Sequence, residues 1–329
     1  MKITLLGAGA WGTALAIAFA GKNEVTLWSR EADVAVDLRQ SRENHRFLPG
    51  HKLPDSVRVE TDFAASLAGA ELLVVSTPIA GLRSTAERLK ELGCTLPLLW
   101  VCKGFEAGTG KLPHQVVAEV LGAKAVCGAL SGPSFAEEVA AGQPTAVTLA
   151  ANDHEFAMNA ARQLHSRRLR IYANDDLIGV EVGGAVKNVL AIATGVCDGL
   201  GLGLNSRAAL MTRGLAEIAR LGVALGAHRD TFMGLAGMGD LILTCTGDLS
   251  RNRRVGLALA KNKSLPQILE ELGHVAEGVH TAHEVERLAT ELAVDMPISR
   301  AIAAVLDGRV SAGDALELLM ARDPKEEAV

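Results

Sequence analysis

The sequence predicts an α/β protein with a doubly wound parallel sheet in residues 1–175 and an all-helical domain in residues 176–329. In the first half, short β-rich runs alternate with Ala-, Leu- and Glu-rich stretches of helical spacing, a pattern typical of βαβ units. After about Asn174 the β-rich runs stop, and Gly-rich turns separate the remaining helical stretches. The length of 329 residues exceeds one ordinary domain of roughly 100–200 residues, which also favours two domains.

We expect eight strands in the first half, with helices between most of them, such as Leu82–Leu92 and His154–Leu164. The run Leu72–Val75 has no polar alternation, which suits a strand that is buried on both faces. The segment Ser41–Ser56 contains two prolines and a glycine, so we expect a surface loop there. The expected strands are Lys2–Leu6, Glu24–Trp28, Val57–Glu60, Glu71–Ser76, Leu98–Cys102, Ala125–Leu130, Ala146–Leu149 and Leu169–Tyr172.

Composition narrows the function classes. The net charge is −5, from 33 basic and 38 acidic residues, so the chain lacks the basic field of a nucleic-acid-binding protein. The five cysteines are widely spaced and form no C-x-x-C pair, which predicts no disulfide framework, no metal site and a reducing, cytoplasmic location. The uncharged run Ile3–Gly21 imitates a signal peptide, but three glycines interrupt it, so we expect neither export nor membrane insertion.

A glycine-rich turn follows the first expected strand. It reads Gly7-Ala8-Gly9-Ala10-Trp11-Gly12, a G-x-G-x-x-G pattern, and an Ala-rich helical stretch and a second strand come after it. Gly7 permits the tight turn, Gly9 lets the backbone approach a pyrophosphate, and Gly12 allows close helix–strand packing. The N–H groups of the helix N-terminus then bind the phosphates. This context predicts a dinucleotide site; the alternative is a structural turn in an unrelated α/β fold.

The end of the second strand indicates which dinucleotide binds. An NAD-preferring site places a carboxylate there, on the ribose 2′-hydroxyl. This chain has Arg30 at that position, and an arginine can grip a 2′-phosphate with paired N–H groups. We therefore expect NADPH, with NADH as the alternative because Glu31 follows directly.

Two further candidates follow expected strand ends, where ligands collect in an open parallel sheet. Lys103 comes directly after the strand Leu98–Cys102 and suits an anionic or carbonyl substrate, unless it is a solvated surface lysine. Ser134 and Glu137 form an S-x-x-E capping box, which predicts that a helix starts there. Its N–H groups could serve an anion or the cofactor, or the box could be only a good helix cap.

Lys187 is the only charged residue in the apolar helical stretch Val182–Cys197. A lysine is almost never buried without a partner or a purpose, and desolvation lowers the pKa of an ammonium group so that it can exchange a proton with a substrate. Gly183 and Gly184 lie on the same helix face and are expected to leave room for a ligand, and Asn188 adds donors and acceptors. The alternative is a lysine that extends from an amphipathic helix into solvent.

Two polar groups follow in the second half. Asp240 and Thr244 are four residues apart, so in a helix both project from one face and suit the hydroxyls of a small polyol; the alternative is an Asp that caps a helix. The segment Ser250–Arg254 holds three arginines, one of which could bind a substrate phosphate while the others pair with acids or solvent.

Taken together, these motifs resemble those of the bacterial type of NAD(P)-dependent glycerol-3-phosphate dehydrogenase. The resemblance covers nearly the whole chain, and six motifs in the same order make it specific. They are GAGAWGTALA at Gly7–Ala16, KGFE at Lys103–Glu106, SGPSFAEEV at Ser131–Val139, GGAVKNVLAI at Gly183–Ile192, GLAGMGDLILTCTGDLSRNRR at Gly234–Arg254 and EGVHT at Glu277–Thr281.

The resemblance implies an N-terminal Rossmann domain and a helical C-terminal domain similar to that of 6-phosphogluconate dehydrogenase. It also implies roles for individual residues. Lys187 is the proton donor and acceptor, Lys103 contacts substrate and cofactor, and Arg251 binds the substrate phosphate. Further substrate contacts are implied for Gly132, Ser134, Asn188, Asp240, Thr244, Ser250 and Asn252. Further cofactor contacts are implied for Gly7, Gly9, Ala10, Trp11, Gly12, Arg30, Arg46, Gly132, Ala136, Arg251, Val275 and Glu277.

The implied reaction is the reversible reduction of dihydroxyacetone phosphate by NADPH to sn-glycerol 3-phosphate, the backbone precursor of phospholipids. It needs no metal, because the hydride carrier and Lys187 supply the chemistry. A homodimer is a further expectation from the family. Two alternatives stay open from the residues: a dehydrogenase of the same architecture that acts on a 3-hydroxy acid, and a non-catalytic NADPH-binding regulator.

Overall fold

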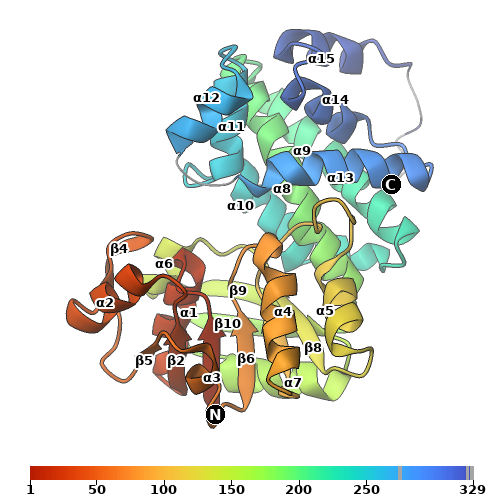
Figure 1. Ribbon diagram of the computed structural model, residues 1–329. Helices are drawn as coiled ribbons and strands as arrows, with labels where there is room; N and C mark the ends of the chain where they lie inside the picture. The colour runs from red at the N-terminus through yellow and green to blue at the C-terminus, as the bar shows by residue number, and fades with distance from the viewer. Residues whose placement is uncertain (273–275, 324–325, 327–329) are drawn as a thin grey trace. The chain divides into compact units, whose positions relative to one another are not determined.

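The computed structural model describes residues 1–272, 276–323 and 326, and Figure 1 labels their helices and strands. The chain forms two compact units. The first consists of Met1–Glu106 and Lys111–Leu177, and the second consists of Ala107–Gly110 and Ile178–Val329. The short segment Ala107–Gly110 therefore belongs with the second unit, where the backbone N–H of Gly108 donates to Glu284 Oε1 at 2.9 Å.

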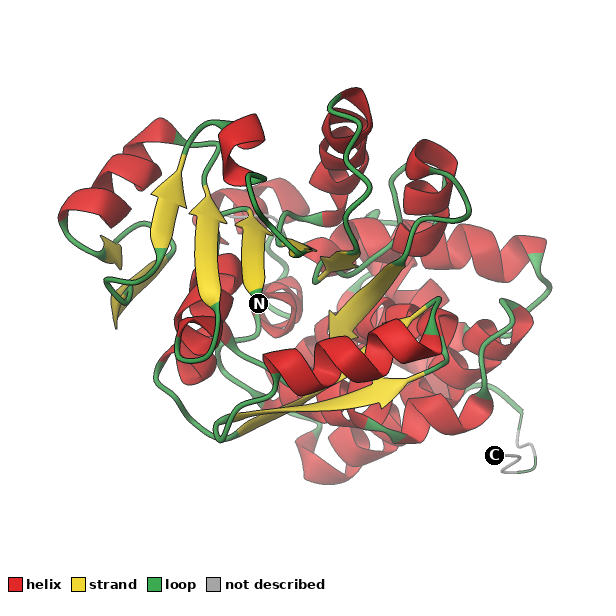
Figure 2. Ribbon diagram, turned by 90° about the horizontal axis from the view of Figure 1, so that it is seen from below, coloured by secondary structure: helices red, strands yellow, loops and turns green. Residues whose placement is uncertain are grey.

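An eight-stranded sheet forms the centre of the first unit, in the order β10-β9-β8-β7-β6-β1-β2-β5. All neighbours are parallel except β8 and β9, which are antiparallel. Figure 2 shows the strands turning progressively from one edge of the sheet to the other, as the right-handed twist of strands requires. The strands are β1 (Lys2–Leu6), β2 (Glu24–Trp28), β5 (Arg58–Glu60), β6 (Leu72–Val75), β7 (Leu98–Trp100), β8 (Cys127–Ser131), β9 (Thr145–Ala151) and β10 (Leu169–Asn174).

The chain builds this sheet outward from β1 in two directions, first through β2 to β5 and then from β6 onward. The gap between the carboxyl ends of β1 and β6 is therefore the switch point where ligands bind in doubly wound sheets. All four residues of β6 are buried, as the uninterrupted apolar run predicts. The helices of this unit are α1 (Ala10–Ala20), α2 (Ala32–Gln40), α3 (Phe63–Ser66), η1 (Ile79–Gly81), α4 (Leu82–Glu91), α5 (Pro113–Leu121), α6 (Ala136–Ala140) and α7 (His154–Leu164).

The expected surface loop at Ser41–Ser56 is wrong in part. The segment contains a two-stranded antiparallel sheet made of β3 (Glu43–Asn44) and β4 (Leu48–Lys52). Asn44 is fully buried, and its Nδ2 donates to Ala8 O at 2.9 Å and to Thr13 Oγ1 at 2.8 Å. Because these bonds reach the glycine-rich turn and α1, the segment is part of the packed unit.

The second unit is helical throughout its described residues. Its central helix α8 (Leu177–Gly199) is long and apolar enough to cross a membrane, but 89% of its most apolar window is buried inside the protein, which is typical of a core helix. Both parts of the predicted fold class are therefore confirmed. The other elements are α9 (Gly203–Ala224), η2 (Arg229–Met233), η3 (Leu235–Gly239), α10 (Asp240–Thr246), α11 (Arg251–Leu259), α12 (Leu265–Leu272), α13 (Glu277–Glu291), α14 (Pro297–Leu306) and α15 (Ala312–Met320).

Candidate active site

The glycine-rich turn between β1 and α1 has the backbone geometry of a dinucleotide loop. Gly7 has a φ of 125°, a conformation that L side chains rarely adopt. A Cβ atom on Gly12 would lie 2.0 Å from Gly7 O, so only glycine lets α1 pack this closely against the turn. A Cβ atom on Gly9, by contrast, would have no atom within 4 Å. The open space is therefore next to Gly9, where the pattern predicts the pyrophosphate.

The N-terminus of α1 has the features of an anion-binding helix end. Gly9 is its N-cap residue, no side chain caps the helix, and its first turn holds no acidic residue. The first N–H groups of α1 can therefore donate to a ligand phosphate. Ala10 and Trp11 are the first two helical residues, and both pack partly buried against the apolar cluster around Leu48. These features fit the pyrophosphate of a nicotinamide dinucleotide.

Ser76 is a residue of this loop that we did not predict. Its Oγ donates to Gly7 O at 2.9 Å, across the switch point between β6 and β1. The same Oγ would lie 2.6 Å from a Cβ atom on Gly12, so the serine fills the space that this glycine leaves. Its place directly after the buried run Leu72–Val75 was the available signal, because ligand loops follow strand ends in such sheets.

The two candidate arginines for a 2′-phosphate both lie on the surface beside α2. Arg30 follows β2, its side chain is 77% exposed, and its Nη2 donates to Glu31 Oε1 at 2.9 Å. Arg46 lies 3.4 Å from Asp33 Oδ2, and its guanidinium stands over the Phe47 ring. Exposed ion pairs of this kind contribute about 0–1 kcal/mol, so either arginine can exchange its carboxylate for a phosphate.

Lys103, Gly132 and Ser134 lie together beyond the carboxyl ends of β7 and β8. Lys103 Nζ lies 3.5 Å from Gly132 O, and Ser134 Oγ donates to the same carbonyl at 3.0 Å. Gly132 has a φ of 138°, and this sharp turn aims its carbonyl at both side chains. The structure thus brings together three of the predicted residues within the first unit.

The predicted capping box at Ser134 and Glu137 is wrong. Helix α6 begins at Ala136, its N-cap residue is Phe135 in an extended conformation, and no side chain caps it. The Ser134 hydroxyl donates to Gly132 O, and no hydrogen bond from an N–H group of α6 to this hydroxyl caps the helix. Ala136 still stands at the first position of α6, but with five residues this helix is too short to form an anion site by itself.

In the second unit, Lys187 forms a buried network with Asp240 and Thr244. Lys187 Nζ lies 2.5 Å from Asp240 Oδ1 and 2.7 Å from Thr244 Oγ1. The Lys187 and Asp240 side chains are 8% and 2% exposed. Asp240 and Thr244 share one face of α10, as their spacing predicts, and Gly239 is the N-cap residue, so Asp240 is not the cap. The network fixes the direction of the ammonium group.

Two expectations about the surroundings of Lys187 need correction. The lysine is not the isolated charge that the apolar stretch suggests, because Asp240 pairs with it from another helix. Nor does Gly183 leave room for a ligand: a Cβ atom there would lie 2.6 Å from Ala236 O. The glycine lets η3 approach α8, and this approach brings α10 and its carboxylate next to Lys187.

The residue after Lys187 connects α8 to α13. Asn188 is buried, and its Nδ2 donates to Glu277 Oε2 at 3.4 Å, at the first position of α13. Asn252 is also buried, and its Oδ1 accepts from Gly278 N at 3.0 Å. Both asparagines therefore hold the N-terminus of α13 next to the lysine helix. The other cofactor candidate in this region, Val275, lies outside the described residues.

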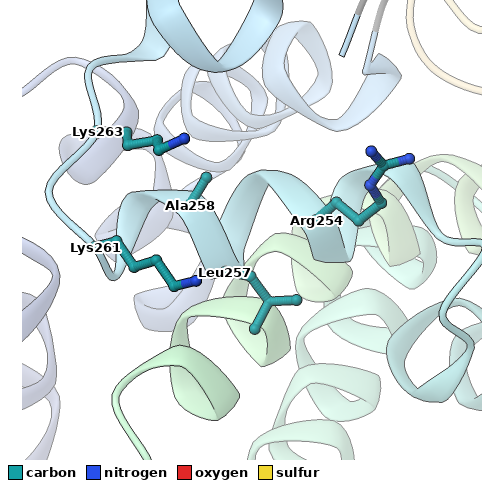
Figure 3. A pocket seen from close by; sticks show the side chains of 5 residues that line it. All are labelled: Arg254, Leu257, Ala258, Lys261 and Lys263. Carbon is teal, nitrogen blue, oxygen red and sulfur yellow. The ribbon is translucent and has the colours of Figure 1, made fainter. Parts of the chain in front are cut away.

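The arginine-rich segment begins α11. Ser250 is the N-cap residue, and its Oγ accepts from Arg253 N at 3.3 Å. Arg251 is exposed and has no side-chain hydrogen bond or ion pair among the described residues. Arg253 points inward and pairs with an acid, as expected for one of these arginines; the acid is Asp198, which the sequence did not single out. Arg254 lines a shallow hollow of about 240 Å³, which Figure 3 shows together with Leu257, Ala258, Lys261 and Lys263.

The fold and these residues define a class of protein. A doubly wound sheet with an open glycine turn at its switch point, and a helical unit with a buried, oriented lysine, are the parts of a two-domain, nicotinamide-dinucleotide-dependent dehydrogenase. Among residues 1–272, 276–323 and 326, no group of three His, Cys, Asp or Glu side chains could hold a metal ion.

Comparisons with known proteins identify the family. Models of the N-terminal and C-terminal parts of the NAD-dependent glycerol-3-phosphate dehydrogenases match residues 2–157 and 176–317. The chain is 83% identical over 327 residues to an NAD(P)+ glycerol-3-phosphate dehydrogenase of Dechloromonas aromatica, covering 99% of both chains. It is 59% identical over 328 residues to that of Aromatoleum aromaticum, covering 99% of this chain and all of the relative.

A solved structure agrees with these relatives. The glycerol-3-phosphate dehydrogenase of Coxiella burnetii matches with a TM-score of 0.93 and 42% identity, covering 98% of this chain and 99% of that one. The chain therefore belongs to the family of NAD-dependent glycerol-3-phosphate dehydrogenases. The family resemblance of the six motifs and the prediction of an NAD(P)-dependent enzyme are thus confirmed.

Proposed function

We propose that this protein reduces dihydroxyacetone phosphate to sn-glycerol 3-phosphate with NADPH, reversibly and in the cytoplasm, and so supplies the backbone of phospholipids. The observation that carries the proposal is the Lys187 ammonium group, held within 2.7 Å of both Asp240 and Thr244 in a buried site. A ketone that accepts a hydride needs a proton on its oxygen, and an oriented ammonium group supplies one.

The first unit provides the cofactor site. Gly9 and the N-terminus of α1 would hold the pyrophosphate, Trp11 would contact the cofactor, and Arg30 and Arg46 would bind the 2′-phosphate. When bound, NADPH supplies the hydride that reaches the carbonyl carbon. The open space beside Gly9 and the uncapped α1 N-terminus support this assignment.

The second unit provides the proton. As the carbonyl carbon gains hydride, its oxygen becomes an alkoxide, and Lys187 Nζ gives that oxygen a proton. The lysine is left neutral and regains a proton from solvent before the next turnover. Asp240 and Thr244 accept hydrogen bonds from the ammonium group and so hold its remaining N–H bond toward the substrate. In the reverse direction the neutral amine removes the proton from the hydroxyl group.

The remaining residues would bind the substrate. Lys103 and Asn188 steady the charge on the carbonyl oxygen, and Arg251 binds the phosphate with its planar fork of donors. Arg251 is suited to this because it is exposed and has no partner among the described side chains. We expect Arg251→Ala to raise the KM for dihydroxyacetone phosphate with little change in kcat. From the family we also propose a homodimer, which light scattering of the purified protein tests.

The test is the rate of NADPH absorbance loss with dihydroxyacetone phosphate, repeated with NADH and with a panel of 3-keto acids. Turnover of the phosphorylated ketone and faster use of NADPH support the proposal. Turnover of the keto acids alone would mean a 3-hydroxy acid dehydrogenase, and NADPH binding without turnover of any substrate would mean a regulator.

A further inference from the structure

Asp198 joins three helices at the C-terminal end of α8. Its Oδ2 accepts from Arg253 Nε at 3.0 Å and from Arg253 Nη2 at 2.8 Å. Arg207 Nη1, from α9, donates to the same carboxylate at 3.2 Å. The Asp198 and Arg253 side chains are only 15% and 14% exposed, so water screens this pair much less than a surface ion pair. Removing the Asp198 carboxylate would take away the buried counterion of the largely buried Arg253 guanidinium.

Asp198 lies on the same face of α8 as Lys187. Eleven residues separate them, which at 100° per residue is three turns plus about 20°, or about 17 Å along the helix axis. Lys187 binds α10 through Asp240, and Asp198 binds α11 through Arg253. One helix face therefore sets the positions of both neighbouring helices.

The backbones of α8 and α11 are in direct contact. A Cβ atom on Gly195 would lie 2.1 Å from Arg253 O, and a Cβ atom on Gly256 would lie 2.0 Å from Ile192 O. Glycine contacts bring two helices close together but offer no side chains that interlock to set their register. The Asp198–Arg253 pair lies at this contact, and its directional hydrogen bonds fix how α11 is rotated and placed along α8.

The same rotation decides where Arg251 points. Arg251 and Arg253 are two residues apart in α11, about 200° around the helix, so they project from opposite sides. Arg253 is held against Asp198, and Arg251 is exposed. The hydrogen bonds that hold Arg253 against Asp198 therefore also set the direction in which Arg251 projects.

We propose that Asp198 is a positioning residue for the substrate phosphate: through Arg253 it fixes α11 so that Arg251 stands at the distance from Lys187 that the phosphorylated substrate requires. This inference rests on the proposed function and adds a residue to it. Asp198 touches no substrate; it sets the geometry of the group that does.

The test compares Asp198→Asn with Asp248→Asn. Both carboxylates accept from Arg253, but Asp248 is 97% exposed, so it is the matched control. We expect Asp198→Asn to raise the KM for dihydroxyacetone phosphate about tenfold, and the inhibition constant of inorganic phosphate by the same factor, with kcat within about twofold of wild type. Asp248→Asn is expected to leave all three values unchanged.

An unchanged KM in Asp198→Asn overturns the proposal, and so does a loss of kcat at unchanged KM, because misfolding or general loosening would reduce turnover without a phosphate-specific effect. If Asp198→Asn does not fold, the same three constants are measured for Arg253→Lys. We again expect the KM and the inhibition constant of inorganic phosphate to rise while kcat stays near the wild-type value. Arg253→Lys keeps the charge but loses the paired N–H groups. Absence of wild-type turnover with dihydroxyacetone phosphate would instead overturn the proposed function itself.

Discussion

Lys187 and Asp240 form a buried ion pair in which Nζ lies 2.5 Å from Oδ1, although 53 residues separate them in the sequence. Burial of two charges removes their hydration, so such a pair adds little net stability compared with apolar residues of the same volume. What the pair contributes is orientation: the Asp240 carboxylate holds the Lys187 ammonium group in one direction. We therefore predict that the pair serves proton transfer more than it serves folding.

Asp240→Asn tests this prediction. The variant keeps the shape of the side chain but removes the negative charge, so the lysine ammonium loses its proton more readily. We expect kcat for the reduction to fall about 10- to 100-fold, and the pH at which activity declines on the basic side to move lower. The measurement is kcat/KM as a function of pH. Asp248→Asn is the control, and a profile that matches the wild type would contradict the role of Asp240.

Gly9→Ala tests the cofactor loop. A Cβ atom on Gly9 meets no protein atom within 4 Å, and its φ of −71° suits alanine, so the variant should fold with an unchanged Tm. The added methyl group occupies the space beside the pyrophosphate, so we expect the Kd for NADPH to rise at least about tenfold. Gly21→Ala is the control because Gly21 also has open space and a φ of −68°. The Kd for NADPH is measured by fluorescence titration. Equal values for the two variants would mean that Gly9 does not lie beside the pyrophosphate.

Arg30→Ala tests the choice between NADPH and NADH. Loss of the guanidinium removes a charge-assisted contact worth roughly 1.5–3 kcal/mol, so the ratio of kcat/KM for NADPH to that for NADH should fall at least about tenfold. Arg167→Ala, at another exposed arginine, should keep the wild-type ratio. If the Arg30 variant also keeps it, the 2′-phosphate is bound elsewhere.

The sequence predicts most of the fold because the signals are local. Buried strands such as β1 and β6 appear as apolar runs, and the glycine turn follows β1 directly. The β3–β4 hairpin could not be predicted in this way. Its anchor is the amide of Asn44, which binds Thr13, a residue 31 positions away, and its sequence carries the prolines and glycine of a loop.

The site residues also divide into features that the local sequence predicts and contacts that it does not predict. Lys187 stands out as one charge in an apolar stretch, and the shared face of Asp240 and Thr244 follows from their spacing. Neither pattern reveals that the two groups meet, since η3 has to approach Gly183 first. The Ser134 capping box failed for a local reason: Phe135 is the N-cap residue of α6, so Ser134 lies one position before the cap.

Glu217 gives a stability prediction. The residue is 1% exposed, and its carboxylate accepts from Ile298 N at 2.7 Å and from Ser299 N and Oγ at 3.1 and 2.9 Å. Burial raises the pKa of Glu217 above its ordinary value of 4.5. A carboxyl with a raised pKa binds its proton more readily in the folded state, so its contribution to stability is fully present below 4.5 and is lost as the pH rises through the raised value.

Glutamine does not titrate, so Glu217→Gln removes this dependence of the unfolding free energy on pH. We therefore expect the difference in unfolding free energy, wild type minus variant, to decrease as the pH rises above 4.5. Urea denaturation at several pH values measures it. The exposed Glu138→Gln should show no such trend. A difference that grows with pH would mean that the hydrogen bonds outweigh burial and that the carboxylate is stabilised in its charged form.

The most direct test of the central claim, that Lys187 supplies the proton, is the kcat of Lys187→Ala measured beside its Kd for NADPH. We expect kcat for reduction of dihydroxyacetone phosphate to fall about 10²- to 10⁴-fold while the Kd stays at the wild-type value, and added methylamine to restore part of the rate. Lys261→Ala, at an exposed lysine, should behave as wild type. Near-wild-type turnover by Lys187→Ala would contradict the claim, because proton transfer would then come from another group.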